Sequence, residues 1–181
     1  MSNTSQAMTL KLTHPAREIR QHVMATLLLA VLACWLAVPA LAQGPPKDLP
    51  NFKFYDLQGK PFARGNLKAG LTTFVFFFSP DCDHCNQEAA WIAAELPQFK
   101  GSQFVFVTWE DNAAAIEAFR KKYFDKTGAP PMTFVKDLDF NIDNFFGPSE
   151  VPCIYVYDNN NKFVKVFREE TKAKALYSLI N

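Results

Sequence analysis

The sequence predicts an α/β domain with a central mixed sheet flanked by helices. Two short apolar runs, residues 74–78 and 103–109, have the continuous hydrophobic character of strands that are buried on both faces. Each run is followed by a segment whose apolar residues recur every three or four positions, as on a helix that packs against a sheet. Strand, helix, strand and helix in this order favour right-handed parallel crossovers. A later strand pair around an Asp-Asn turn adds antiparallel pairing.

The first 42 residues are predicted to be a signal peptide. Lys11, Arg17 and Arg20 form a basic start, residues 25–38 are apolar, and residues 40–42 read Ala-Leu-Ala, a small-residue cleavage pattern. We therefore expect the mature protein in the periplasm, where disulfides persist. An uncleaved membrane anchor is the alternative, because residues 24–42 are just long enough to cross a bilayer.

Residues 43–50 contain Pro45-Pro46 and are predicted to be an extended linker, which leaves residues 51–181 as the folded domain. Phe52 and Phe54 alternate with polar residues ahead of Gln58-Gly59, and this pattern predicts a hairpin at the start of the domain.

The central strand, from Thr72 through the apolar run, ends at Ser79-Pro80, and Cys82-Asp83-His84-Cys85 follows directly. A helix is expected from about Cys82 until Pro97 closes it. Its inner face carries apolar residues at spacings of four, three and four: Cys85, Ala89, Ile92 and Leu96.

The second half of the domain follows from similar patterns. Asp111-Asn112 can cap the next helix. The elements expected after it are a helix over 113–123, an extended piece over 133–135, a short helix over 140–146, strands over 154–157 and 163–167 around a turn at 158–161, and a closing helix over 172–180.

The two cysteines at the strand-to-helix junction are candidates for thiol chemistry. Unpaired amides and the positive end of the dipole at a helix N-terminus stabilise a thiolate. Cys82 and Cys85 lie three residues apart and can close and reopen a disulfide, with Cys82 attacking and Cys85 resolving. His84 can assist a thiolate at Cys82, whereas the negative charge of Asp83 works against it.

Other uses of the Cys-x-x-Cys pair fit less well. A structural disulfide of this kind would close a very short loop, and stabilisation falls with loop size. Zinc needs four ligands, and only one further cysteine follows the predicted leader. Haem attachment requires a histidine directly after Cys85, where Asn86 stands.

Residues 74–88, FVFFFSPDCDHCNQE, resemble the thioredoxin superfamily and specifically its TlpA/ResA-like extracytoplasmic branch. The Cys85-x-x-Glu88 continuation, the distant Val151-Pro152 and the hairpin expected over residues 51–62 also match that branch. The resemblance implies a thioredoxin fold, with a central mixed sheet flanked by helices and an N-terminal hairpin extension. It further implies a cis-proline at Pro152 that faces the dithiol and shapes a substrate-binding edge together with Val151.

Glu88 lies three residues after Cys85 and shares the helix face that points into the domain. A carboxylate buried there can accept and return the Cys85 proton, because desolvation raises its pKa. A glutamate in the first turns of a helix is also favoured simply by the dipole. The resemblance favours the catalytic interpretation.

Cys153 departs from the family pattern, in which Thr, Ser or Ala usually follows the proline. It can be a third thiol near the dithiol, where it would form a mixed disulfide or bind Cu(I). It can equally be a small buried apolar residue.

These observations together predict a periplasmic thiol–disulfide oxidoreductase that reduces or exchanges disulfides in client proteins. The resemblance implies a membrane partner that donates electrons. No cofactor or metal is expected beyond the dithiol. The leader holds three of the nineteen basic and one of the eighteen acidic residues, so the net charge of the remaining chain is close to zero. Nucleic acid is therefore not an expected partner. We expect a monomer.

Two other functions stay open at this stage. A copper chaperone would bind Cu(I) through Cys82, Cys85 and either His84 or Cys153. A peroxiredoxin-like peroxidase would need a Thr or Ser three residues before the attacking cysteine, and Ser79 occupies that position, although Pro80 follows it rather than preceding it.

Overall fold

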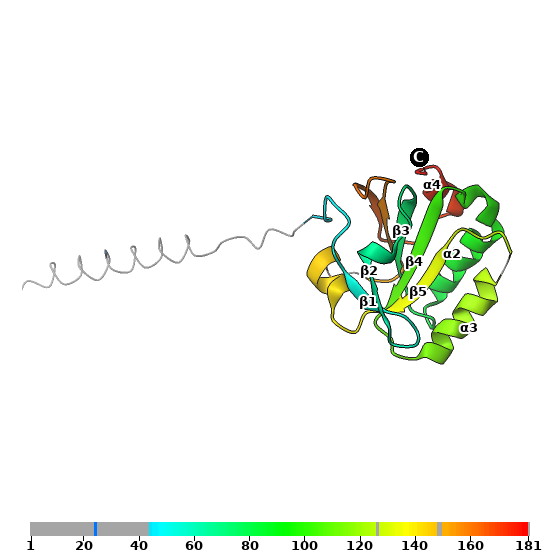
Figure 1. The fold of residues 1–181 in the computed structure, drawn as a ribbon, viewed down its shortest axis with the longest axis horizontal. Coiled ribbons are helices and arrows are strands. Elements are labelled where there is room, and N and C mark those ends of the chain that lie inside the picture. The colour runs from blue at the N-terminus through cyan, green and yellow to red at the C-terminus, as the bar shows by residue number, and fades with distance from the viewer. Residues whose placement is uncertain (1–23, 25–43, 126, 148–149, 181) are drawn as a thin grey trace, which may run out of the picture. The chain divides into compact units, whose positions relative to one another are not determined.

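The computed structural model describes residues 24, 44–125, 127–147 and 150–180. Within them, one seven-stranded mixed sheet has the order β2-β1-β5-β4-β3-β6-β7 (Figure 1). The strands are β1 Lys53–Tyr55, β2 Pro61–Ala63, β3 Thr72–Phe77, β4 Ser102–Thr108, β5 Met132–Lys136, β6 Cys153–Tyr157 and β7 Phe163–Phe167. The helices are α2 Asp83–Ala94, α3 Ala113–Phe124 and α4 Ala173–Tyr177, with short helical turns η1 Arg64–Asn66, η2 Leu96–Phe99 and η3 Ile142–Phe146.

The predicted signal peptide, residues 1–42, lies outside the described residues except for Met24. Among the residues that are described, no helix is both long and apolar enough to cross a bilayer. The described residues from 44 onward belong to one compact unit.

Strand β3 occupies the middle of the sheet, and all six of its residues are buried. It pairs in parallel with β4 on one side and antiparallel with β6 on the other, so that Phe77 lies opposite both Val107 and Cys153. The prediction of a central strand buried on both faces is confirmed. Strand β4 in turn pairs in parallel with β5, which confirms the two parallel crossovers.

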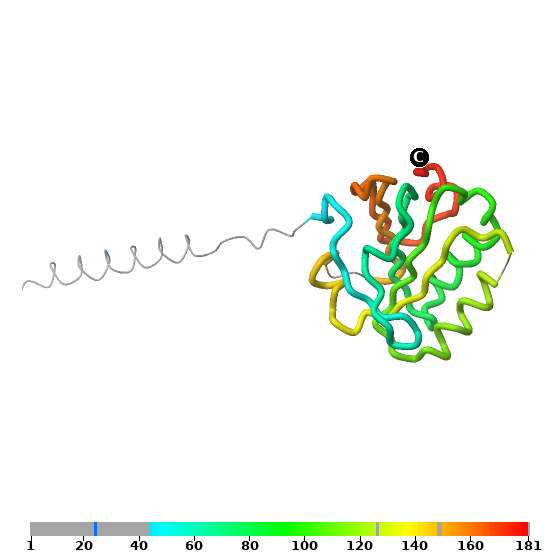
Figure 2. The backbone as a smooth tube through the Cα atoms, viewed as in Figure 1, coloured from blue at the N-terminus to red at the C-terminus, as the bar shows by residue number. Residues whose placement is uncertain are grey.

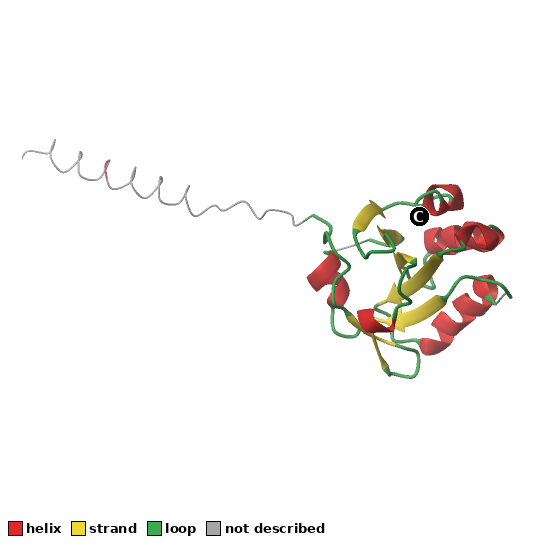
Figure 3. Ribbon diagram, turned by 45° about the horizontal axis from the view of Figure 1, so that its top comes forward, coloured by secondary structure: helices red, strands yellow, loops and turns green. Residues whose placement is uncertain are grey.

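The two faces of the sheet carry separate cores. Phe74, Phe76 and Phe78 lie on the face covered by α2, α3 and α4, and Val75 and Phe77 lie on the face that packs against η3. Figure 3 shows α2 and α3 together on one side of the strands. Stacked phenylalanine rings cross the strands on the helix-covered face, for example Phe106 and Phe134 with ring centroids 4.5 Å apart. The phenylalanine-rich runs are therefore core, as the sequence indicates.

Several boundaries differ from the sequence-based expectation. The extended piece expected at 133–135 is a five-residue strand, because β5 finds partners in both β4 and β1. The closing helix is shorter than predicted: α4 ends at Tyr177, and Leu179 and Ile180 continue as hydrogen-bonded turns.

The second half of the predicted linker belongs to the folded domain. Leu49 is completely buried in the core of the η3 face. The amide of Leu49 donates to the carbonyl of Asn161 at 2.9 Å, and the amide of Phe163 donates to the carbonyl of Lys47 at 2.9 Å. The turn between β6 and β7 thus supplies backbone partners for a segment whose prolines suggested only an extended connector. Figure 2 shows this N-terminal part of the domain, in cyan, beside the yellow segment around η3.

We therefore expect Leu49→Ala to lower the free energy of unfolding by about 2–5 kcal/mol, because it leaves a cavity in a closed core. Urea unfolding monitored by circular dichroism measures this change. The matched control is Val164→Ala on β7, where the side chain is 38% exposed and the expected change is within about 0.5 kcal/mol. Equal small effects of both substitutions would show that residues 47–50 do not contribute to the fold.

Candidate active site

Cys82 is the N-cap residue of α2, directly after the loop that leaves β3. Its Sγ accepts a hydrogen bond from the backbone amide of Cys85 at 3.1 Å and lies 3.9 Å from the carbonyl oxygen of Val151. The side chain is partly exposed. An unpaired backbone amide at the start of a helix thus points at the Cys82 sulfur, which is the more accessible sulfur of the pair.

Cys85 lies in the first turn of α2 and is completely buried. Burial raises the pKa of its thiol well above the usual range, and the hydrogen bond with Cys82 raises it further. The structure thus places a buried Cys85 behind a partly exposed Cys82, and their roles as second and first nucleophile stay a prediction.

Glu88 lies on the buried face of α2, one turn beyond Cys85, and has no exposed surface. Its Oε1 accepts a hydrogen bond from the amide of Thr171 at 3.0 Å, while Oε2 has no hydrogen-bond partner among the described residues. Burial raises its pKa to about 8, the charge of Glu170 adds to the rise, and the Thr171 amide opposes it. A carboxyl group with this pKa exchanges protons close to neutral pH.

The Val151-Pro152 peptide bond is cis, as the resemblance implied. Both residues line a groove of about 370 Å³ together with His84, Arg168 and the Glu169-Glu170 pair. The carbonyl of Val151 is the one that approaches the Cys82 sulfur. The groove therefore begins beside the attacking thiol.

Asp83 and His84 are both exposed in the first turn of α2. The Nδ1 atom of His84 is hydrogen-bonded to the carboxylate of Glu170, and both residues line the groove. The structure thus pairs His84 with an acidic side chain, whereas the sequence suggested an interaction with the Cys82 thiolate.

Cys153 is buried on the opposite face of the sheet from Cys85. It is the first residue of β6, pairs with Phe77 of β3, and packs in the core that contains Tyr155 and Phe146. Because side chains alternate along a strand, the sheet itself separates this thiol from the dithiol. Its place on that face disfavours the suggested mixed disulfide and copper-ligand roles. Within the described parts of the chain, no group of three or more His, Cys, Asp or Glu side chains is arranged to hold a metal ion.

Two features of the site were missed by sequence reasoning. Asn86, used there only to exclude haem attachment, donates from Nδ2 to the carbonyls of Pro80 and Cys82 at 2.8 and 3.0 Å and accepts from Tyr123 Oη at 2.7 Å. It therefore ties the cysteine loop to α3. The Glu170-Thr171 loop reaches His84 and Glu88 from more than eighty positions away, and no local pattern signals this contact.

Because the pKa of Glu88 is raised in the folded protein, the free energy of unfolding depends on pH. Between its ordinary value of 4.5 and about 8, the folded state binds more protons than the unfolded state, so stability falls as pH rises through this window. We expect Glu88→Gln to flatten this decline and to stabilise the protein by up to a few kcal/mol above pH 8. Urea unfolding at pH 5 and pH 8 measures the difference, with exposed Asp83→Asn as the control. An unchanged slope in the Gln variant would contradict the raised pKa.

Comparisons with known proteins agree with this geometry. Residues 45–166 match the model of the AhpC/TSA family. The structure of DsbF from Mycobacterium tuberculosis, solved in mixed oxidised and reduced forms, is 25% identical, with a TM-score of 0.58 over 71% of this chain and 91% of that chain. No curated protein sequence matches the chain.

Two further solved structures share the fold. A secreted M. tuberculosis disulfide oxidoreductase homologous to Escherichia coli DsbE is 21% identical, with a TM-score of 0.59 over 71% of this chain and 92% of that one. A putative thiol:disulfide interchange protein DsbE from Chlorobium tepidum is 18% identical, with a TM-score of 0.60 over 76% and 95%. The chain therefore belongs to the AhpC/TSA family, has the thioredoxin fold of TlpA/ResA-like proteins, and is an oxidoreductase of the thiol–disulfide class.

Proposed function

We propose that this protein is an extracytoplasmic, most simply periplasmic, oxidoreductase that reduces or exchanges disulfides in client proteins through Cys82 and Cys85. One observation carries the proposal: the accessible Cys82 sulfur accepts a hydrogen bond from the amide of the buried Cys85 at the start of α2, beside the cis-proline groove. The M. tuberculosis neighbour that is described as secreted supports the location outside the cytoplasm.

The reaction has two exchange steps. The Cys82 thiolate attacks one sulfur of the client disulfide, a mixed disulfide forms, and the other client sulfur leaves as a thiolate that takes a proton from water. Cys85 then gives its proton to Glu88, attacks the Cys82 sulfur and releases the second client thiolate. The client gains two electrons, and the protein is left with a Cys82–Cys85 disulfide.

A second dithiol must return the protein to its reduced form. We propose a membrane-bound electron donor that exchanges with the Cys82–Cys85 disulfide by the same chemistry in reverse. The dithiol is the redox centre in this scheme, which therefore requires neither a prosthetic group nor a metal. A monomer with no nucleic-acid partner stays our prediction.

Cysteine variants separate the roles of the three thiols. We expect Cys82→Ser to abolish insulin reduction, and Cys85→Ser to accumulate a mixed disulfide with the client because nothing resolves it. Cys153→Ser is the matched control, because this thiol lies on the far face of the sheet, and its turnover is expected to stay within about twofold of wild type. Insulin turbidity and mass spectrometry of trapped adducts are the measurements. Equal losses in all three variants, or activity that survives Cys82→Ser, would refute the assignment.

Hydroperoxide reduction is a second candidate, favoured by the AhpC/TSA family match. Against it, the Ser79 hydroxyl is hydrogen-bonded to the carboxylate of Glu110, whereas the Cys82 sulfur contacts Cys85 and the Val151 carbonyl. A peroxide-consumption assay with a dithiol reductant decides between the two. Turnover of hydrogen peroxide that exceeds turnover of protein disulfides would replace the proposed function with a peroxidase.

A further inference from the structure

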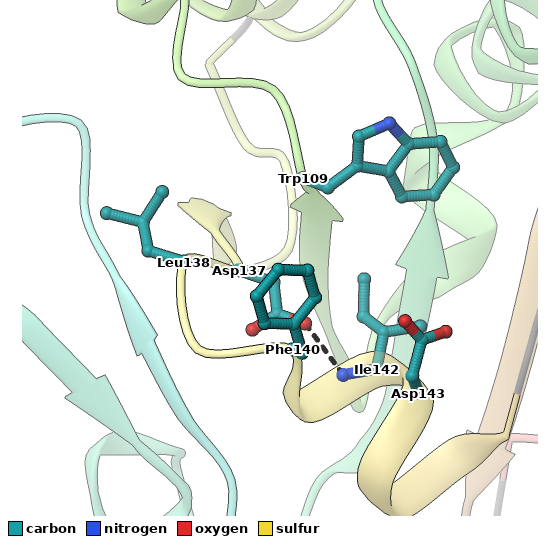
Figure 4. A pocket seen from close by; sticks show the side chains of 6 residues that line it. All are labelled: Trp109, Asp137, Leu138, Phe140, Ile142 and Asp143. Carbon is teal, nitrogen blue, oxygen red and sulfur yellow. Dashed lines mark hydrogen bonds between the residues drawn. The ribbon is translucent and has the colours of Figure 1, made fainter.

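A second concave surface, apart from the cis-proline groove, lies next to the ends of β4 and β5. Its volume is about 410 Å³, and it is bordered by Trp109, Asp137, Leu138, Phe140, Ile142 and Asp143. Figure 4 shows Trp109, which follows β4, across the hollow from the turn that carries Phe140 and Ile142. Trp109 is 49% exposed and Phe140 is 70% exposed. Large apolar side chains gathered around one hollow mark a binding surface more often than isolated exposed ones do.

The hollow is shaped by a fixed turn. The carboxylate of Asp137 accepts hydrogen bonds from the amides of Asn141 at 2.9 Å and Ile142 at 2.7 Å, and the side chain of Asn141 accepts from the amide of Lys53 on β1 at 3.0 Å. These bonds hold Phe140 at a φ of 55°, in the left-handed region that bulky residues rarely adopt. A costly conformation that places an aromatic ring in solvent is more typical of functional sites than of ordinary loops.

The hollow and the dithiol share one edge of the sheet. The carboxyl ends of β3 and β4 lie side by side, with Phe77 opposite Val107, and the Ser79 hydroxyl contacts Glu110, the residue after Trp109. Strand β5, which leads to Phe140, is the next neighbour of β4. Strands in a sheet are about 5 Å apart, so the end of β5 lies about 10 Å from the end of β3, the strand whose following loop carries Cys82. About three residues of extended polypeptide span this distance.

The charges around this edge are mainly acidic. Asp143 is exposed at the rim of the hollow, and none of the described residues that border the hollow is basic. The nearby cations Lys53 and Lys136 are already paired with Asp139 and Asp111. An apolar side chain with a cationic neighbour complements both properties of the surface.

We propose that this hollow binds a large apolar side chain, next to a Lys or Arg, about three residues from the reacting cysteine of an extended client polypeptide. The inference rests on the proposed function and adds the recognition of the client to it. The client would cross the edge of the sheet with its disulfide at Cys82 and its apolar residue between Trp109 and Phe140.

Synthetic peptides test the proposal with the full, reduced protein. Each peptide carries one cysteine activated as a thiopyridyl disulfide and, about three residues away, either Phe-Lys or Ser-Lys. In separate peptides this dipeptide stands on the N-terminal or on the C-terminal side of the cysteine. The release of thiopyridone reports the reaction with Cys82. Dithiodipyridine, which is too small to reach both the dithiol and the hollow, reports the reactivity of the dithiol alone.

For one of the two placements, we expect the wild-type protein to react with the Phe-Lys peptide about tenfold faster, in second-order rate constant, than with the matching Ser-Lys peptide. A factor of this size is typical when one buried aromatic side chain is lost from an interface. Phe140→Asn and Trp109→Thr should remove this preference and leave the reaction with dithiodipyridine unchanged. Asn tolerates the left-handed backbone, so the first substitution should preserve the turn. The matched control is Val164→Thr, an exposed apolar residue on β7, which should keep the full preference.

The possible failures are distinguishable. If wild type reacts with dithiodipyridine but shows no Phe preference, or if the Phe140 and Trp109 variants keep it, the docking proposal is wrong and the dithiol chemistry stands. If wild type reacts with none of the disulfides, the proposed function and the docking proposal both fall. If sedimentation shows a wild-type dimer that Phe140→Asn disrupts, and no peptide preference exists, a second copy of the chain occupies the hollow and the proposal is overturned.

Discussion

The site depends on one hydrogen bond, from the amide of Cys85 to the sulfur of Cys82. That bond exists because α2 begins immediately after the loop that follows β3, and β3 is held between β4 and β6 with all its residues buried. The buried strand fixes where the loop starts, and Asn86 fixes its other end against α3. The Cys82 sulfur is thereby held at a helix N-terminus by a backbone amide.

Glu88, the buried acid behind the dithiol, lowers the stability of the fold when it is ionised. Glu88 has no exposed surface, one of its oxygens has no hydrogen-bond partner among the described residues, and its pKa of about 8 reflects the cost of ionising it there. Burial is the main cause of the raised pKa, the amide of Thr171 opposes it, and the charge of Glu170 adds a smaller rise. A group that is unfavourable for folding at high pH thus lies one helical turn behind Cys85, where the proposed mechanism uses it as the proton acceptor.

The sheet divides the molecule into two faces with different roles. Cys85 and Glu88 are on the buried side of α2, which covers one face of the sheet. Cys153 packs on the other face, in the core that contains η3 residues. The dithiol loop follows β3, the cis-proline precedes β6, and Trp109 of the hollow follows β4. Because β4 and β6 both pair with β3, these three features lie at the same edge of the sheet. In the proposed docking mode, a client polypeptide would use the dithiol loop for chemistry and the hollow for recognition.

The sequence by itself determined the central strand, the helix with Cys82 and Cys85 at its start and Glu88 on its buried face, and both hairpins, because each depends on local periodicity and turn chemistry. The cis-proline was predicted only through the resemblance. Tertiary structure decided that Leu49 is core, that His84 pairs with Glu170, that Cys153 faces away from the dithiol, and that Trp109 and Phe140 border one hollow. These facts depend on which strands become neighbours and on contacts between distant segments, and such contacts leave no periodic signal in the chain.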